Sequence, residues 1–156
     1  MRQLGICVLL VCLSLSRAAL AQADQEYIFR PAEDAWVNDS SPETNYGANT
    51  YLTVRDRSGL AEAYLRFSQE ELSRVLAGQT IVSAALFVYQ YSGTNSPGDA
   101  INAHIVTQEW TGSAIDWNTR PAYESGSISS VTVSDPVEGW RQWQGMEPVV
   151  SAWMQG

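Results

Sequence analysis

From Tyr27 onward the chain alternates apolar and polar residues in short runs, which clusters of glycine, proline, asparagine and serine separate. Side chains of a β-strand point to opposite faces in turn, so a period of two marks a strand with one buried face. In residues 62–67, Ala63, Leu65 and Phe67 occupy one such face. Many short strands with frequent turn residues predict an all-β fold, and we expect a jelly-roll-like antiparallel β-sandwich with one or two short helices.

The same patterns predict the individual elements. We predict strands over residues 27–30, 34–38, 51–55, 62–67, 81–91, 101–105 and 128–133. Between two of them, Ser68 and Glu71 form a capping box, which predicts a short helix that stops at Gly78. Pro148 suits the first turn of a second helix. No repeat or linker interrupts this order, so we expect a single domain.

The first 23 residues have the layout of a secretory signal peptide. Arg2 gives a positive start, residues 4–15 form an apolar run, and two A-x-A sites end at Ala21 and Ala23. The run is shorter than the roughly 20 apolar residues of a membrane-spanning helix. We therefore predict cleavage after Ala23, a secreted or extracellular location, no membrane span after cleavage, and a domain over residues 24–156.

Charge and cysteine content restrict the function of the remaining chain. Cys7 and Cys12 both lie in the predicted leader, so disulfides, thiolate nucleophiles and cysteine-bound zinc are excluded after cleavage. Without Arg2 and Arg17, seven basic residues oppose 17 acidic ones, and no lysine is present. Such an acidic surface repels phosphate backbones, so we expect no nucleic-acid partner.

Several groups of residues occur in an order found in a known family. Asp34-Ala35-Trp36-Val37 is followed by Pro42-x-x-Asn45-Tyr46-Gly47 and Leu52-x-Val54. Tyr64-Leu65-Arg66-Phe67 then precedes the short helix and the apolar run 81–89. The most specific group is Trp110 with Ile115-Asp116-Trp117-Asn118 and Pro121, and a final helix carries Val150 and Trp153. In this order and spacing, residues 27–156 resemble the DNRLRE-type domain, which is similar to carbohydrate-binding module family 96.

This resemblance implies a secreted β-sandwich that binds polysaccharide, alginate being the ligand known for characterised members. It also implies further strands after the C-terminal helix, so we expect residues 24–156 to lack the last strands of such a domain. Other modules of a longer secreted protein are then expected partners. One departure lies before Pro148, where the family usually has Asp-Val-Thr and this chain has Gly145-Met146-Glu147.

Aromatic and arginine side chains are the candidate ligand contacts. Apolar faces of sugar rings pack on aromatic planes, and guanidinium groups suit the carboxylates of uronates. Pairing of the strands predicted at 51–55 and 62–67 would gather such residues on one face. The candidates for this face are Trp36, Tyr51, Arg55, Arg57, Tyr64 and Arg66. The alternative is ordinary tyrosine packing and cross-strand ion pairs with Asp56 and Glu62.

Two further candidates lie in the polar stretch 138–145, which we predict to be a loop. Trp140 and Trp143 stand there among glutamines and glycines, and either contact a ligand or fold over the core. The remaining tryptophans, Trp110, Trp117 and Trp153, are expected to pack inside the domain.

Few residues of the chain suit catalytic or metal chemistry. His104 is the one histidine, and no nucleophile elbow or second histidine accompanies it, so we predict no catalytic residues and no enzyme. A glycosidase needs only a carboxylate pair, which 17 acidic residues leave open. We predict no cofactor; Asp34, Asp39 and Asn45, or Asp116 and Asn118, could hold a structural calcium, although such residues more often form turns.

Three functions remain open at this point. The first is a non-catalytic carbohydrate-binding module that contacts an extracellular polysaccharide, such as a uronate polymer. The second is a structural or adhesion module without a sugar site, and the third is a small polysaccharide-degrading enzyme. Exposed aromatic rings in line with arginines would favour the first of these functions.

Overall fold

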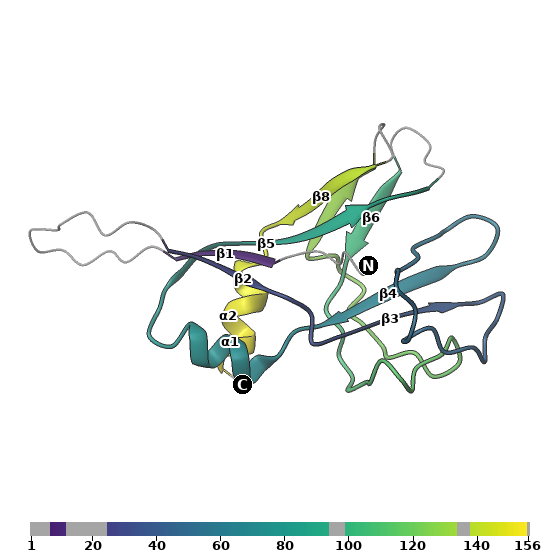
Figure 1. The fold of residues 1–156 in the computed structure, drawn as a ribbon, viewed down its shortest axis with the longest axis horizontal. Helices are drawn as coiled ribbons and strands as arrows, with labels where there is room; N and C mark the ends of the chain where they lie inside the picture. Colours follow the sequence, from purple (N-terminus) through teal and green to yellow (C-terminus); the bar gives the residue numbers. More distant parts are fainter. Residues whose placement is uncertain (1–6, 12–24, 94–98, 134–137, 156) are drawn as a thin grey trace, which may run out of the picture.

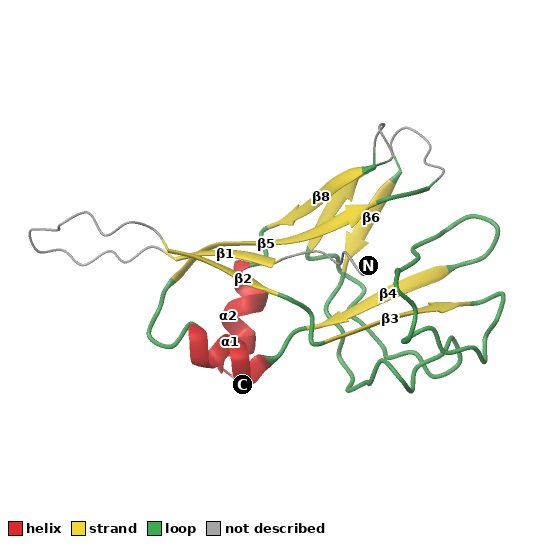
Figure 2. Cartoon of the chain, viewed as in Figure 1, coloured by secondary structure: helices red, strands yellow, loops and turns green. Residues whose placement is uncertain are grey.

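The computed structural model describes residues 7–11, 25–93, 99–133 and 138–155. It contains eight strands and two short helices within these ranges (Figures 1 and 2). The elements, in chain order, are β1 (Cys7–Val11), β2 (Gln25–Phe29), β3 (Glu33–Asn38), β4 (Ala61–Arg66), α1 (Gln69–Val75), β5 (Ile81–Gln90), β6 (Ala100–Ala103), β7 (Ser129–Thr132), β8 (Gly139–Gln144) and α2 (Glu147–Gln155).

The strands form three antiparallel sheets. One sheet has the strand order β2-β1-β5-β8, and two smaller sheets pair β3 with β4 and β6 with β7. The predicted all-β class with two short helices is therefore confirmed. The jelly-roll connection of these sheets stays a prediction.

Strand β1 lies inside the segment that we predict to be a signal peptide. Its backbone pairs with β2 on one side and with β5 on the other, so it occupies the interior of the largest sheet (Figure 1). Removal of the leader stays a prediction, and it would take a central strand out of this sheet.

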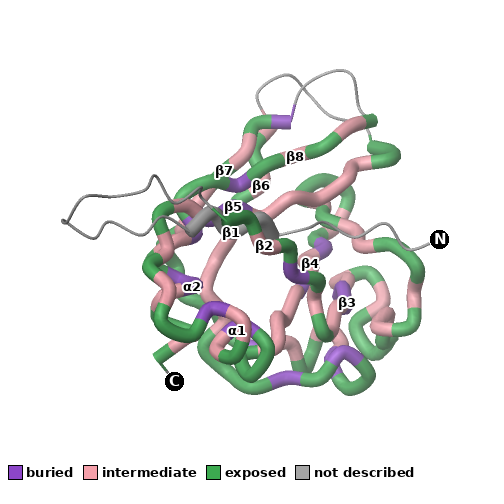
Figure 3. Tube along the Cα trace, turned by 60° about the vertical axis from the view of Figure 1, so that its left-hand side comes forward, coloured by how far each residue is buried: buried purple, intermediate pink, exposed green. Residues whose placement is uncertain are grey.

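The larger core lies between this sheet and the two helices, which run side by side beneath it (Figures 1 and 3). Its buried members come from β2, α1, β5, β8 and α2, from the residue after α1 and from the residue before α2: Phe29, Leu72, Leu76, Ala84, Trp143, Met146 and Val150. The capping box at the start of α1 is confirmed in part, because the Ser68 hydroxyl accepts a hydrogen bond from the Glu71 amide at 3.1 Å. In place of the family's threonine cap, α2 begins at Glu147, whose carboxylate accepts from the Ala84 amide at 3.0 Å.

A second core lies on one face of the β3–β4 pair. Segment 106–117 covers this face, and the buried residues there are Ala35, Val37, Tyr64, Trp110 and Ile115. The Asn45 amide ties the neighbouring loop to the same segment, donating to the carbonyl oxygens of Gly112 at 2.9 Å and Ile115 at 2.6 Å. Gly47 lies against Gly112 in this contact, and a side chain at Gly47 would collide with the Gly112 carbonyl.

Two sequence predictions of local structure were wrong. Residues 51–55 are not a strand, since Arg55 alone forms an isolated bridge, with Ala61. Conversely, Gly139–Gln144 is a strand rather than a loop, because its backbone pairs with β5. Within the described part of the chain, neither helix is long and apolar enough to cross a lipid bilayer.

Candidate functional site

Four aromatic side chains form a continuous series of ring contacts, which we call the aromatic row: Trp36, Tyr46, Tyr51 and Tyr91. Trp36 stacks on Tyr46 with ring centroids 3.8 Å apart, and its centroid lies 6.0 Å from that of Tyr51. Tyr51 meets Tyr91 edge-on at 6.5 Å. Trp36 is only 7% exposed, whereas Tyr51 is 40% and Tyr91 51% exposed. The row therefore runs from a buried base to two rings that solvent can reach.

Strand β3 and the loop after it position the base of the row. Trp36 lies on the face of β3 opposite the second core, because neighbours on a strand alternate in direction. The Asn45 contacts described above hold Tyr46 in place, as Asn45 is its immediate neighbour. The Trp36 indole nitrogen is buried and has no hydrogen-bond partner in the described part of the chain. A buried donor of this kind normally finds a partner. The Trp36 indole N–H at the base of the row can therefore still donate a hydrogen bond.

Arg55 and Arg57 lie in the same loop region as Tyr51. The Arg55 guanidinium donates to the Asn38 side-chain oxygen at 2.9 Å and to the Gly59 carbonyl at 3.2 Å. Arg57 donates to Asp99 at 2.9 Å, yet 63% of its side chain remains exposed. Arg55 therefore ties the end of β3 to the residues before β4, whereas most of the Arg57 side chain is exposed to solvent.

The single face that we predicted from the sequence does not form. Tyr64 and Arg66 are in register with Ala35 and Glu33, so they lie on the face of the β3–β4 pair that carries the second core, away from Trp36. Tyr64 is buried there. Arg66 pairs with Glu33 and lies 5.7 Å from the Trp110 ring centroid. The structure thus joins Trp36 to Tyr51 and separates both from Tyr64 and Arg66.

A polar cluster borders this second face. The Glu62 carboxylate accepts hydrogen bonds from Tyr64 at 2.7 Å and Tyr123 at 3.3 Å, and pairs with Arg120 at 3.4 Å. Arg120 in turn lies 3.8 Å from the Trp117 ring centroid. Burial, and then the bond to Glu62, raises the pKa of Tyr64, and the Glu62 charge raises the pKa of Tyr123. These contacts keep both hydroxyls protonated as donors.

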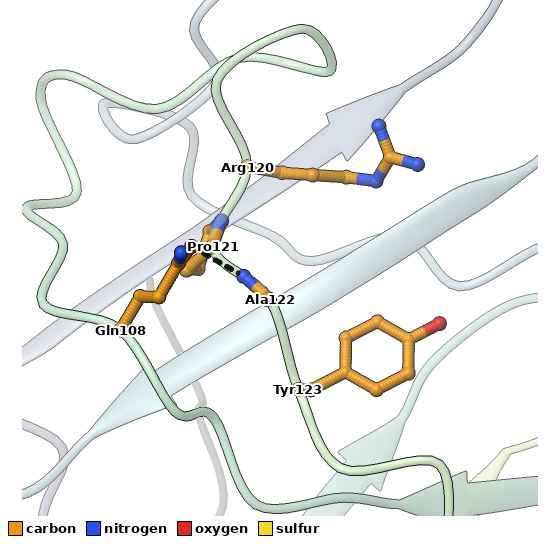
Figure 4. Close-up of a pocket in the computed structure, with 5 residues that line it drawn as sticks. All are labelled: Gln108, Arg120, Pro121, Ala122 and Tyr123. Atoms are coloured by element: carbon orange, nitrogen blue, oxygen red, sulfur yellow. Dashed lines mark hydrogen bonds between the residues drawn. The ribbon is translucent and has the colours of Figure 1, made fainter.

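An open hollow of about 430 Å³ lies beside this cluster. Its lining is Gln108, Arg120, Pro121, Ala122 and Tyr123, and the Arg120 and Tyr123 side chains extend to the same side of their segment (Figure 4). Gln108 accepts from the Ala122 amide at 2.8 Å. Arg120 is already paired with Glu62, so a ligand in this hollow would compete with that carboxylate for the guanidinium.

Comparison with known proteins identifies the family. The model of carbohydrate-binding module family 96 matches residues 25–156. The chain belongs to this family. No curated protein and no solved structure matches the chain. The resemblance inferred from the sequence motifs is thereby confirmed at the level of the family.

The two tryptophans of β8 differ in their exposure to solvent. Trp140 is 51% exposed and meets Tyr89 edge-on at 5.4 Å. Trp143 is only 5% exposed, and its indole nitrogen donates to the Ile101 carbonyl at 2.8 Å. Trp143 is thus a core residue that cannot contact a ligand in this structure, while Trp140 remains a candidate outside the aromatic row.

The acidic residues considered for calcium take part in turns and loop contacts. Thr119 donates to Asp116 through its hydroxyl and its amide, both at 2.8 Å, which lowers the pKa of Asp116. The Leu60 amide likewise lowers the pKa of Asp39. Within the ranges that the structure describes, no three histidine, cysteine, aspartate or glutamate side chains gather as a metal site. The His104 ring lies within 2.9 Å of the Glu124 carbonyl oxygen and 5.1 Å from the Tyr123 ring centroid.

Sequence reasoning missed Tyr46 and Tyr91 as members of the row. Tyr46 was visible only as part of the family motif with Asn45 and Gly47. Tyr91 directly follows the longest strand, where an aromatic residue at a strand end was the available signal. Tyr46 and Tyr91 are linked through Trp36 and Tyr51. These contacts depend on loop positions that the alternation of residues does not predict.

Proposed function

We propose that the module binds an extracellular polysaccharide along the aromatic row and catalyses no reaction on it. The observation that carries this proposal is the continuous contact from buried Trp36 to the exposed rings of Tyr51 and Tyr91. Apolar faces of sugar rings pack on such planes. Because the inner rings already restrain the outer ones, ligand binding costs less side-chain conformational entropy.

We further propose that a uronate polymer such as alginate is the preferred ligand. Arg57 supports this preference, since 63% of its side chain is exposed and it lies in the same loop region as Tyr51. A guanidinium fork can pair with a carboxylate through two parallel hydrogen bonds. A uronate would compete with Asp99 for this group.

Affinity electrophoresis of the purified chain in alginate and in a neutral β-glucan tests both proposals. We expect alginate to retard the chain, and Tyr51→Ala and Tyr91→Ala to weaken binding roughly tenfold each, equivalent to about 1.4 kcal/mol. Arg57→Ala should weaken binding to alginate alone. Tyr123→Ala is the matched control, because it removes a tyrosine ring of similar exposure that lies outside the row.

Two results would contradict these proposals. A folded chain that neither polymer retards would exclude the sugar site and favour a structural or adhesion module. A polymer that shortens during the assay would contradict the absence of catalysis.

We also propose that the module is exported and that residues 1–23 are removed. The positive Arg2, the apolar run 4–15 and the two A-x-A sites support this proposal. Mass spectrometry of the chain expressed in a secreting host should find Asp24 as the first residue. A product that keeps Met1 and stays with the cells would contradict export.

A further inference from the structure

The largest sheet depends on a strand that export would remove. β1 is the only strand that pairs with β2 in the described part of the chain. It also covers the β5 edge opposite β8. Loss of β1 would therefore leave β2 without a paired strand. It would also expose the backbone groups on the β1 side of β5, and exposed strand edges readily pair with another chain.

The backbone of β5 is oriented to receive a strand in this position. Ala84 directs its polar groups away from β1, because its amide donates to Glu147 at 3.0 Å and its carbonyl accepts from Met146 at 3.1 Å. Successive residues of an antiparallel strand direct these groups to opposite sides. Ser83 and Ala85 therefore direct theirs toward β1, and a strand there is needed to pair them.

The two faces of the space between β2 and β5 differ in polarity. Position 9 of β1 is in register with Tyr27 and Ala84, which belong to the larger core or pack against it. Position 10 is in register with Glu26, which is exposed, and Ser83, which is half-buried. A strand in this space thus needs an apolar residue at position 9 and tolerates a polar one at position 10.

β2 and β5 cannot simply close the space while keeping their present contacts. Both run antiparallel to β1 and hence parallel to each other, about two strand spacings or roughly 10 Å apart. Direct pairing would require β2 to shift by one spacing and would draw Phe29 out of its place in the core.

We propose that the space between β2 and β5 is a strand-acceptor site, which an extended segment of another polypeptide with apolar residues at alternate positions fills once the leader is gone. Binding follows the known mode in which a peptide adds a strand to a sheet through backbone hydrogen bonds and side-chain pockets. The leader strand β1 holds the same place in the precursor. This inference rests on the proposed export, but its test does not.

The test uses the full chain with a protease recognition sequence inserted between Ala23 and Asp24. After folding and cutting, residues 1–23 are separated from the cut chain in urea and the urea is diluted away. A fluorescent peptide of residues 5–13 with lysines added at both ends is then titrated into the cut chain, and anisotropy reports its uptake. Two variant peptides carry the same substitution on opposite faces: Leu9→Asp and Leu10→Asp. We expect uptake of the unmodified peptide, at most a threefold loss for Leu10→Asp, and more than a tenfold loss for Leu9→Asp.

Each alternative outcome is decisive. Equal binding of both variant peptides would show non-specific hydrophobic association and overturn the proposal. A cut chain that releases residues 1–23, keeps its near-UV circular dichroism and takes up no peptide would show that the sheet closes, and would also overturn it. A cut chain that aggregates unless the unmodified peptide is present would support a strand acceptor, and aggregation that this peptide fails to prevent would overturn it.

Discussion

At the scale of single residues, Glu62 and Tyr64 show how a buried hydroxyl acts on the second core. Tyr64 is almost fully buried, and its hydroxyl donates to the Glu62 carboxylate at 2.7 Å. Burial and this neighbouring charge both disfavour the phenolate, so the pKa of Tyr64 rises well above its usual range. The hydroxyl therefore stays a donor, and Tyr64 acts in structure rather than in ligand contact.

This environment predicts a loss of stability at high pH. A tyrosine whose pKa is raised on folding contributes stability that is complete below the unfolded pKa of about 10 and declines above it. We expect the free energy of unfolding to fall above pH 10 by up to about 1.4 kcal/mol per pH unit for this residue. Tyr64→Phe should cost about 1 kcal/mol at pH 7, through the lost hydrogen bond, and should flatten that decline.

Urea unfolding between pH 7 and pH 11 measures both effects. Tyr123→Phe serves as the control, because Tyr123 contacts the same carboxylate but is largely exposed, so its effect on the slope should be smaller. An unchanged decline in Tyr64→Phe would show that other groups cause the alkaline loss.

At the scale of elements, sequence patterns succeeded where the determining contacts are local. The capping box placed α1, and alternation placed β3 and β4 within one or two residues of their observed ends. Residues 51–55 alternate in the same way, but only Arg55 pairs with a strand, at Ala61 of β4, so they form a loop. The reverse holds for β8. Its glutamines and glycines suggest a loop, but backbone pairing with β5 makes it a strand.

The candidate site was predicted only in part for the same reason. Trp36 and Tyr51 were selected by residue type and do meet. Their partners Tyr46 and Tyr91 were not selected, since the row joins residues from two loops and a strand that lie far apart along the chain. Tyr64 and Arg66 lie on the side of the β3–β4 pair that carries the second core. Alternation alone would leave this side to solvent, but segment 106–117 covers it.

At the scale of the whole molecule, the acidic surface and the proposed uronate ligand oppose each other. The chain carries a net charge of −8, which becomes more negative if Arg2 and Arg17 leave with the predicted leader. Long-range repulsion then acts against association with a polyanion, while Arg57 attracts only at short range. Stacking on the aromatic row must therefore supply most of the affinity.

This balance predicts how binding responds to salt. Raising the ionic strength from 0.01 M to 0.15 M shortens the Debye length from about 30 Å to about 8 Å, which screens the repulsion. The exposed Arg57 contact loses little, because such ion pairs contribute at most about 1 kcal/mol. We expect alginate affinity to stay constant or rise a few-fold over this range, measured by isothermal titration calorimetry. Affinity for any neutral polymer that binds should not change, and it serves as the control. A steep fall in alginate affinity would instead mean that arginine–carboxylate pairs dominate binding and that the aromatic row is secondary.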